Sequence, residues 1–442
     1  MKAGTIIILI LTIVFVGVLA LCGLTAFGTY SWFNANTDGV HFFYSEDTSF
    51  ELVETETYPV SGAVDLILDT SFGNISITTH EANVIEIEKE ITAWGEDKES
   101  AQARAESLPI EIKQNGDSLS ITYKPENRSD VAIFGEVRGD SVNFNIKVPA
   151  ETAVEVDSSF GKILLDGVTG GANLTGGFGD ITVTNVSGSL VVKGMQSKLD
   201  VSTVDAGEES IHLETTFGGI TAEGLSGASL FVRTSNGEMV LTEINTAEGL
   251  AMENQFGAIR LEEFQAESLK LVDMNGAVEL LNGTLNGPLD ASTTFGEITV
   301  TNVEAERYVL DTNNGNLVID GAQGELQLSN QFGPITVLNA EQAILTAKSS
   351  NGMISFSGSL DEDASHLVET SFGEIALAIP EDSNFSLSLD AQMGKIDSEI
   401  PVMLSGSMSE NHWEADMNEG GNKLTMKTNN GNIYILKLSE EQ

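Results

Sequence analysis

The chain has 442 residues, and its 66 aspartates and glutamates outnumber 21 lysines and arginines, which gives a formal net charge of −45. This charge excludes nucleic acids and anionic lipid surfaces as partners, because binding to phosphate groups needs clustered lysines and arginines. Length alone suggests about three domains, but the repeats over residues 151–400 predict one elongated body instead.

Residues 4–28 contain no charged side chain. A helix of this length would cover roughly 37 Å, which exceeds the roughly 30 Å hydrocarbon core of a bilayer. We therefore predict a transmembrane anchor over 4–28, after a cytoplasmic stub (1–3) and before a linker (29–50). Lys2 precedes the span, so the rule that positive charge stays inside predicts that the bulk of the chain is extracytoplasmic.

Two other interpretations of the leader stay open. It could be a cleaved signal peptide, although its apolar stretch is longer than usual and no small-residue cleavage site is obvious. It could also be a lipoprotein signal around Cys22, the sole cysteine, although Leu21 stands where a small residue is expected. A single cysteine excludes a disulfide within the chain.

Residues 51–150 mostly lack the repeat and are predicted to form a β-rich N-terminal cap. One copy of the repeat motif occurs there, at Ser71 to Ile75. Glu96 to Leu108 is rich in helix-forming residues and is followed by Pro109, which predicts a single helix. An unlike terminal segment of this kind blocks growth of a repeat stack at its end.

Residues 151–400 carry a repeat of roughly 19 residues, which is typical of a solenoid. Each repeat has a glycine preceded in most copies by Phe or Asn, and these positions are Gly161, Gly179, Gly218, Gly237, Gly257, Gly276, Gly296, Gly315, Gly333, Gly352, Gly373, Gly394 and, beyond the range, Gly431, with Ser197 at one further step. Around Gly296, Ile298 and Val300 alternate with polar residues, as in a half-buried strand, and a second alternating segment follows. We predict an all-β, elongated parallel β-solenoid with two short strands per coil, whose coils, spaced by about 4.8 Å, make a body roughly 70 Å long.

The residue before each glycine alternates between Phe and Asn over much of the repeat. We interpret this alternation as relief of crowding between aromatic rings on neighbouring coils, and we explain the glycines by a backbone with positive φ at a corner. Asn-Gly is also a strong hairpin signal. An antiparallel meander is therefore the alternative fold.

Residues 401–442 are predicted to form a C-terminal cap and the last coil. The repeat is interrupted between Pro380 and Asp416, and the spacing from Gly394 to Gly431 is counted as two steps. Strand-like alternation resumes from Leu424 to the end of the chain.

The sequence offers no recognisable catalytic, cofactor-binding or metal site. His41, His80, His212, His366 and His412 are scattered without metal-ligand spacing, and each is expected at the surface. Gly176 to Asp180 is similar to one calcium-binding nonapeptide, but its aspartate comes one residue early and the match occurs once. Asp361 to Asp363 is expected to form an acidic, solvated loop.

Several segments resemble a family of bacterial envelope proteins of unknown function that are labelled as candidate adhesins. These segments are Val148 to Ala150 leading into Val154 to Ile163, the repeated Thr-x-x-Gly-x-Ile steps, and Thr428 to Tyr434. The resemblance covers about residues 50–438, although the family usually has Ser-Gly where this chain has Phe-Gly or Asn-Gly. It implies a β-solenoid beyond the cytoplasmic membrane and implies no catalytic residues.

We therefore expect a non-catalytic, membrane-anchored structural, adhesive or protein-interaction module of the cell envelope, with an envelope protein or polysaccharide as its partner. One alternative is an extracellular carbohydrate-active enzyme, which would need paired carboxylates in a groove. Another is a surface protein stabilised by calcium, which the excess of acidic residues would favour.

Overall fold

The computed structural model describes residues 48–125 and 139–439. Contacts divide the chain into two compact units, Met1–Thr48 and Ser49–Gln442, and the second unit contains nearly all of the described residues. The predicted anchor over 4–28, the stub and most of the linker lie outside the described residues. Within the described residues no helix is both long and apolar enough to cross a bilayer.

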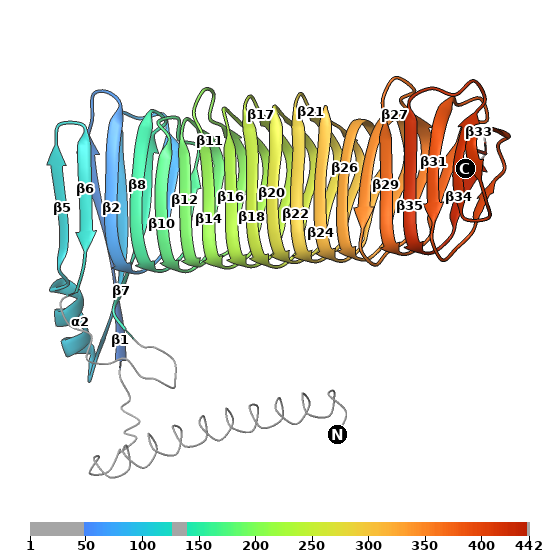
Figure 1. Cartoon of the computed structure of the whole chain (residues 1–442). Helices are drawn as coiled ribbons and strands as arrows, with labels where there is room; N and C mark the ends of the chain where they lie inside the picture. The colour runs from blue at the N-terminus through green and yellow to red at the C-terminus, as the bar shows by residue number, and fades with distance from the viewer. Residues whose placement is uncertain (1–47, 126–138, 440–442) are drawn as a thin grey trace, which may run out of the picture. The chain divides into compact units, whose positions relative to one another are not determined.

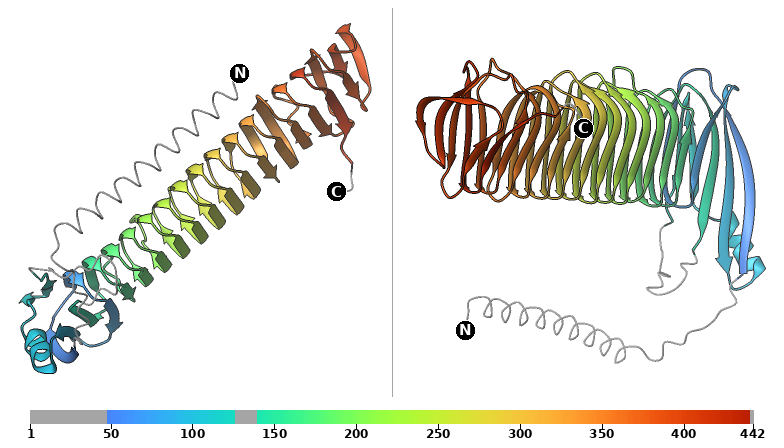
Figure 2. Two further views of the ribbon diagram at one scale, coloured as in Figure 1. Left: turned by 90° about the horizontal axis from the view of Figure 1, so that it is seen from below. Right: turned by 90° about the vertical axis from the view of Figure 1, so that its right-hand side faces the viewer.

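The second unit is a parallel β-solenoid built from two facing sheets (Figure 1). Each coil contributes one strand to each sheet, and each strand pairs in parallel with the equivalent strand of the next coil, as when Ile298 of one coil pairs with Val278 and Leu317 of its neighbours. The predicted fold class is confirmed in this respect, and the antiparallel meander is wrong. The views in Figure 2 show the same stack from two other directions.

One sheet, called sheet B, runs the length of the stack. In spatial order its strands are β5 (Ile110–Asn115), β6 (Ser118–Tyr123), β2 (Val64–Phe72), β8 (Thr152–Phe160), β10 (Ala172–Phe178), β12 (Leu190–Gln196), β14 (Ile211–Phe217), β16 (Leu230–Asn236), β18 (Gly249–Phe256), β20 (Ser268–Asn275), β22 (Pro288–Phe295), β24 (Arg307–Asn314), β26 (Gln323–Phe332), the second half of β27 (Ile335–Ser349), β29 (His366–Phe372), β35 (Lys423–Asn430), β31 (Phe385–Ala391), β34 (His412–Met417) and β33 (Val402–Met408).

The facing sheet, sheet A, runs beside it. Its strands in spatial order are β1 (Thr48–Pro59), β4 (Val84–Gly95), β7 (Ser141–Pro149), β3 (Ile75–His80), β9 (Ile163–Asp166), β11 (Ile181–Ser187), β13 (Leu199–Asp205), β15 (Ile220–Gly227), β17 (Met239–Thr246), β19 (Ile259–Ala266), β21 (Val278–Leu285), β23 (Ile298–Glu304), β25 (Leu317–Asp320), the first half of β27, β28 (Ile354–Leu360), β30 (Ile375–Ile379), β36 (Ile433–Lys437) and β32 (Ile396–Ser398).

The core lies between the two sheets and is formed by inward side chains from both. Leu289 and Ala291 of β22 face Ile298 and Val300 of β23 in a typical coil, and all four are buried. Because two short strands cannot enclose a core alone, each coil depends on its neighbours to cover these side chains.

The strands of sheet A from β11 to β23 each contain a bend that the alternation pattern does not reveal. The bend residue has φ near +50°, as at Asn282 (52°) and Asn302 (51°), and it drops out of the strand pairing while its neighbours stay in register. Such a bulge reorients the following residue. Val303 is therefore buried like Val300, although it follows Val300 by three positions and strict alternation would place it on the opposite face.

The strands of residues 48–149 do not stack in chain order. β2 and β3 form a full coil that pairs with β8 and β9 on one side and with β6 and β7 on the other. Antiparallel pairing then ends the stack, with β5 against β6 and β4 against β7. The single described helix, α2 (Lys98–Glu106), lies within the predicted range Glu96 to Leu108, and it packs against β4 and buries Ala101 and Ala105.

The C-terminal coil is also out of chain order. β35 lies between β29 and β31 (Figure 1). In the facing sheet β36 lies between β30 and β32. The expectation that Gly394 and Gly431 lie two steps apart is therefore wrong: they belong to neighbouring coils, and the later coil is inserted before the earlier one. Antiparallel β34 and β33 end sheet B.

Candidate functional site

The glycines of the repeat line one edge of the solenoid, where each coil turns from sheet B into sheet A. A Cβ atom on Gly296 would lie 1.7 Å from the carbonyl oxygen of Gly276, and one on Gly315 would lie 1.8 Å from that of Gly296. The same approach recurs along the edge and follows spatial order, since a Cβ on Gly431 would meet Gly373 and one on Gly394 would meet Gly431.

This close backbone contact corrects the prediction that the edge glycines are needed because their backbone has a positive φ. Gly161, Gly179 and Gly257 do have φ between 126° and 134°, but Gly296 and Gly315 are not among the residues with positive φ. The requirement that all share is close approach to the backbone of the neighbouring coil. Ser197 shows that a side chain is tolerated at one step.

Directly before these glycines is a row of residues that we call the corner column. In spatial order it is Phe72, Phe160, Phe178, Gln196, Phe217, Asn236, Phe256, Asn275, Phe295, Asn314, Phe332, Asn351, Phe372, Asn430 and Met393. The phenylalanines from Phe217 onward are 51–57% exposed, and Met393 is 78% exposed. Exposed aromatic and apolar side chains therefore recur along this edge, with polar side chains between many of them, and exposed apolar groups of this kind mark interaction sites.

The alternation in the corner column is not needed to avoid crowding. Phe72, Phe160 and Phe178 occupy consecutive coils, and their rings stack in parallel with centroids 4.9 and 4.8 Å apart. These are favourable offset-stacking separations. The interpretation that Asn relieves aromatic crowding is therefore wrong.

Inside the edge, two residues before the corner column, buried polar side chains form a second row, the inner ladder. Half of its side chains donate hydrogen bonds to the carbonyl of the glycine on the adjacent coil, as Thr234 does to Gly218 (3.0 Å), Asn254 to Gly237 (3.1 Å) and Thr370 to Gly352 (2.9 Å). These bonds satisfy carbonyl groups at the turn and fix the position of the edge.

Asp273 is the one acid of the inner ladder. It is 2% exposed, and neither carboxyl oxygen has a hydrogen-bond partner. Burial raises the pKa of Asp273 to about 6, and the nearby amide groups of Asn275 and Met274 offset only part of that effect. The next residue of the ladder, Thr293, also has a hydroxyl without a partner.

A polar hollow of about 600 Å³ lies on the outer face of sheet B beside the corner column. On five consecutive coils the residue just before the corner column lines it, and these residues are Asn313, Gln331, Ser350, Ser371 and Asn429. Lys348, Glu369 and Lys427 form its other side, with Lys427 Nζ 3.3 Å and Lys348 Nζ 4.0 Å from Glu369 carboxylate oxygens. The hydroxyl of buried Ser349, also in the lining, has no hydrogen-bond partner.

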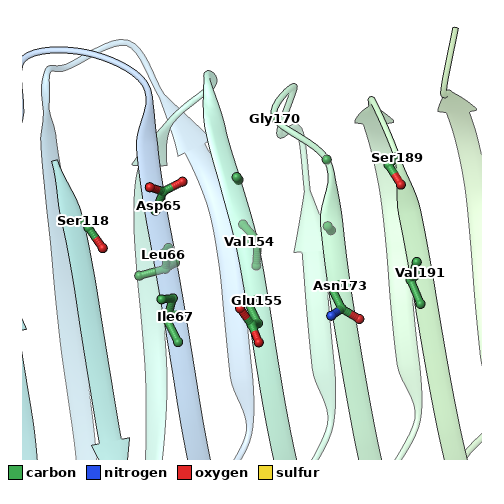
Figure 3. A pocket seen from close by; sticks show the side chains of 13 residues that line it. Asp65, Leu66, Ile67, Ser118, Val154, Glu155, Gly170, Asn173, Ser189 and Val191 are labelled. Atoms are coloured by element: carbon green, nitrogen blue, oxygen red, sulfur yellow. The ribbon is translucent and has the colours of Figure 1, made fainter. Parts of the chain in front are cut away.

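A second hollow, of about 410 Å³, lies on the outer face of sheet B near the N-terminal end of the stack. Figure 3 shows Asp65 on β2 and Glu155 on β8, together with Ile67, Asn173 and Val191 on this face. Two carboxylates are thus present, but no lysine, arginine or histidine is among the lining residues. The hollow gives no basis for assigning a catalytic residue.

Of the histidines, His41 lies outside the described residues and His366 contradicts the expectation of a surface position. His366 is 2% exposed and meets the Phe385 ring edge-on at 5.3 Å. Its Nδ1 accepts from Leu345 N–H at 3.1 Å, so Nε2 carries the proton and donates to the Asp361 carbonyl at 2.9 Å. Burial lowers the pKa of His366, which keeps it neutral. His80, His212 and His412 are part-buried on β3, β14 and β34.

The two acidic motifs, Gly176 to Asp180 and Asp361 to Asp363, make contacts with neighbouring residues of the solenoid. Asp180 lies 3.6 Å from Lys162, and Glu362 accepts from the backbone and side-chain nitrogens of Asn384 at 3.0 and 3.2 Å. Among the described residues no group of three or more histidine, cysteine or acidic side chains is arranged to hold a metal ion.

The fold and its glycine edge define the chain as a parallel β-solenoid repeat protein. It belongs to the Toastrack DUF4097 family, whose profile matches residues 72–299 and 263–436. The recognition made from sequence is thereby confirmed. Among curated proteins no sequence matches the chain.

Three solved structures are similar to the chain at low identity. A candidate cell adhesion protein from Clostridium sporogenes is 9% identical over 88% of this chain and 100% of its own, with a TM-score of 0.18. A candidate adhesin from Bacteroides fragilis is 12% identical over 87% and 97%, with a TM-score of 0.20. A candidate adhesin from Parabacteroides distasonis is 11% identical over 74% and 97%, also with a TM-score of 0.20.

Proposed function

We propose that the protein is a structural and adhesive module of the bacterial cell envelope, held at the membrane by residues 4–28 with the solenoid on the outer side. The observation that carries the proposal is the uninterrupted two-sheet stack with a regular exposed edge. Such a body presents the same few groups many times along its length, which suits binding spread over many weak contacts.

Charge supports this proposal. A net charge of −45 keeps copies of the chain apart and soluble. The apolar, uncharged run over 4–28 and the lysine before it favour an anchor whose short end stays inside. The names of the similar solved structures agree with an adhesive role for those proteins.

The location is tested with intact cells that carry the full chain. Protease added outside should digest the solenoid while a cytoplasmic marker survives, and the full chain should sediment with membranes. Deletion of residues 4–28 should remove the chain from the membrane fraction. A solenoid that is digested only after the cells are opened would contradict the proposal.

The adhesive role is tested by comparing attachment of cells that carry and lack the chain to glycan-coated and protein-coated surfaces. Loss of attachment on deletion, with return on re-expression, is expected. A deletion strain that attaches as well as the parent to every surface would leave only the structural role.

A further inference from the structure

The alternation of the corner column is a property of neighbours in space. Register pairs Phe256 and Phe295 with an asparagine on both sides, and it pairs Phe217 with Asn236 and Phe332 with Asn314. The pattern continues through the inserted coil, where Asn430 pairs with Phe372 and exposed Met393 follows. Copying of a sequence repeat would give alternation in chain order, and here chain order is Phe372, Met393, Asn430.

Packing does not require this pattern, because Phe72, Phe160 and Phe178 stack on consecutive coils. The asparagines are held to the edge instead: Asn275 Nδ2 donates to the Gln255 carbonyl at 3.2 Å and Asn314 Nδ2 to the Thr294 carbonyl at 3.4 Å. The rings thus stand separately, about half exposed, with a polar gap between each pair. Two coils separate successive rings, a spacing of roughly 9.6 Å.

On the basis of the proposed adhesive function, we propose that the corner column binds an extended, neutral, β-linked polysaccharide that runs parallel to the solenoid axis. The C–H face of a sugar ring packs on an exposed aromatic ring, and the ring spacing is close to the length of one disaccharide in an extended β-linked chain. Every second sugar would then rest on a phenylalanine, and the sugar between would lie over an asparagine.

The polar side chains beside the corner column can form hydrogen bonds with the hydroxyl groups of such a polysaccharide. Asn313, Gln331, Ser350, Ser371 and Asn429 line the polar hollow next to Phe332 and Phe372. Amides and hydroxyls both donate and accept, as sugar hydroxyls do. Lys348 and Lys427 add further donors, and Glu369 between them offsets one of their two positive charges.

The negative charge of the protein favours a neutral polysaccharide over two other occupants of the corner column, a second copy of the protein and an anionic polysaccharide. A second copy of the chain would bring another net charge of −45 against the edge. An anionic polysaccharide would meet the same repulsion. A neutral glycan loses nothing by approaching an acidic body, and repeated weak contacts along it give affinity that rises with its length.

The test measures binding of the full chain, in detergent, to β-1,4-linked oligosaccharides of glucose and of N-acetylglucosamine by titration calorimetry, with hyaluronan as an anionic contrast. Affinity should rise with oligosaccharide length, and hyaluronan should not bind. The triple variant Phe256→Ser, Phe295→Ser and Phe332→Ser should bind the longest neutral chain at least about tenfold more weakly.

The matched control is Leu164→Ser with Leu338→Ser, which removes exposed apolar side chains from sheet A instead. It should bind as the parent does, and melting curves should show that both variants remain folded. Equal binding by the triple variant, no dependence on length, or no binding of either neutral series overturns the inference. Such a result with attachment of cells intact would leave the adhesive function standing with a different ligand.

Discussion

At the scale of single residues, the edge is set by close backbone contacts and not by turn conformation alone. A glycine on the edge has the carbonyl of the neighbouring coil where a Cβ would stand. The spacing of these glycines is visible in the sequence, but the backbone contact that requires them is visible only when successive coils are placed against each other.

The first prediction concerns this contact. Gly315→Ala should lower the free energy of unfolding by about 3 kcal/mol or more, because the coils must separate locally to admit the methyl group. Gly249→Ala is the control, since its Cβ would meet only Ser268 Oγ at 3.5 Å. The free energy of unfolding of both variants is measured by urea denaturation. Equal values would show that the neighbouring coils can move apart to admit the methyl group at little cost.

The second prediction concerns Asp273, whose folded pKa of about 6 lies above its ordinary value of 3.8. The folded state therefore binds this proton more tightly, so the associated stability is present at low pH and is lost as pH rises from about 4 through 6. Asp273→Asn should stabilise the protein by up to about 3 kcal/mol at neutral pH and little near pH 4. The new amide can donate to the edge as Asn254 does.

Asp290→Asn is the matched control, because Asp290 is exposed on the neighbouring strand β22. His366 titrates in the opposite direction, since burial lowers its pKa. Wild type and both variants must therefore be compared at each pH by thermal melting. No gain for Asp273→Asn at neutral pH would mean that water or a cation reaches the carboxylate.

At the scale of elements, the sequence predicts the strands well because inward and outward residues alternate in most repeats, as in β22 and β23. The helix α2 is equally predictable from its composition and from Pro109. The bulges of sheet A are not, because glutamate and threonine stand at φ of 54–56° at Glu243, Glu263 and Thr203, and neither residue type signals that conformation.

The order of coils at the two ends could not be predicted from spacing. The motif at Phe72 and Gly73 marks a coil, but its neighbours are separated from it along the chain. Likewise the distance from Gly394 to Gly431 fits two steps, although the structure uses the residues between them for antiparallel strands β33 and β34. Pairing between distant segments leaves no periodic signal in the sequence.

The third prediction concerns the inserted C-terminal coil. Deletion of residues 423–442 removes β35 and β36, so β31 and β32 lose their parallel partners. Residues 381–417 should then become sensitive to limited proteolysis, with cleavage sites identified by mass spectrometry. Deletion of 439–442 removes no described strand and should leave the pattern unchanged. Resistance of both products would show that β33 and β34 alone hold this end.

At the scale of the whole molecule, stacking of coils makes length the dominant dimension of the solenoid. The fourth prediction is that a fragment beginning at residue 35 gives the scattering profile of a rod, because strands add along one axis at about 4.8 Å per coil. The profile should not change between low and moderate salt, since the hydrophobic core and not charge fixes the shape. A compact, near-spherical profile would contradict the stacked arrangement.

Insertion of the last coil also bears on biosynthesis. Strand β31 pairs on one side with β34 and on the other with β35, and β35 begins only at Lys423. During synthesis or export this end of the stack therefore has an unfilled slot until the final residues emerge. A chain that is stalled or clipped before that point keeps unpaired strand edges, which are the features by which proteases and chaperones distinguish unfinished proteins.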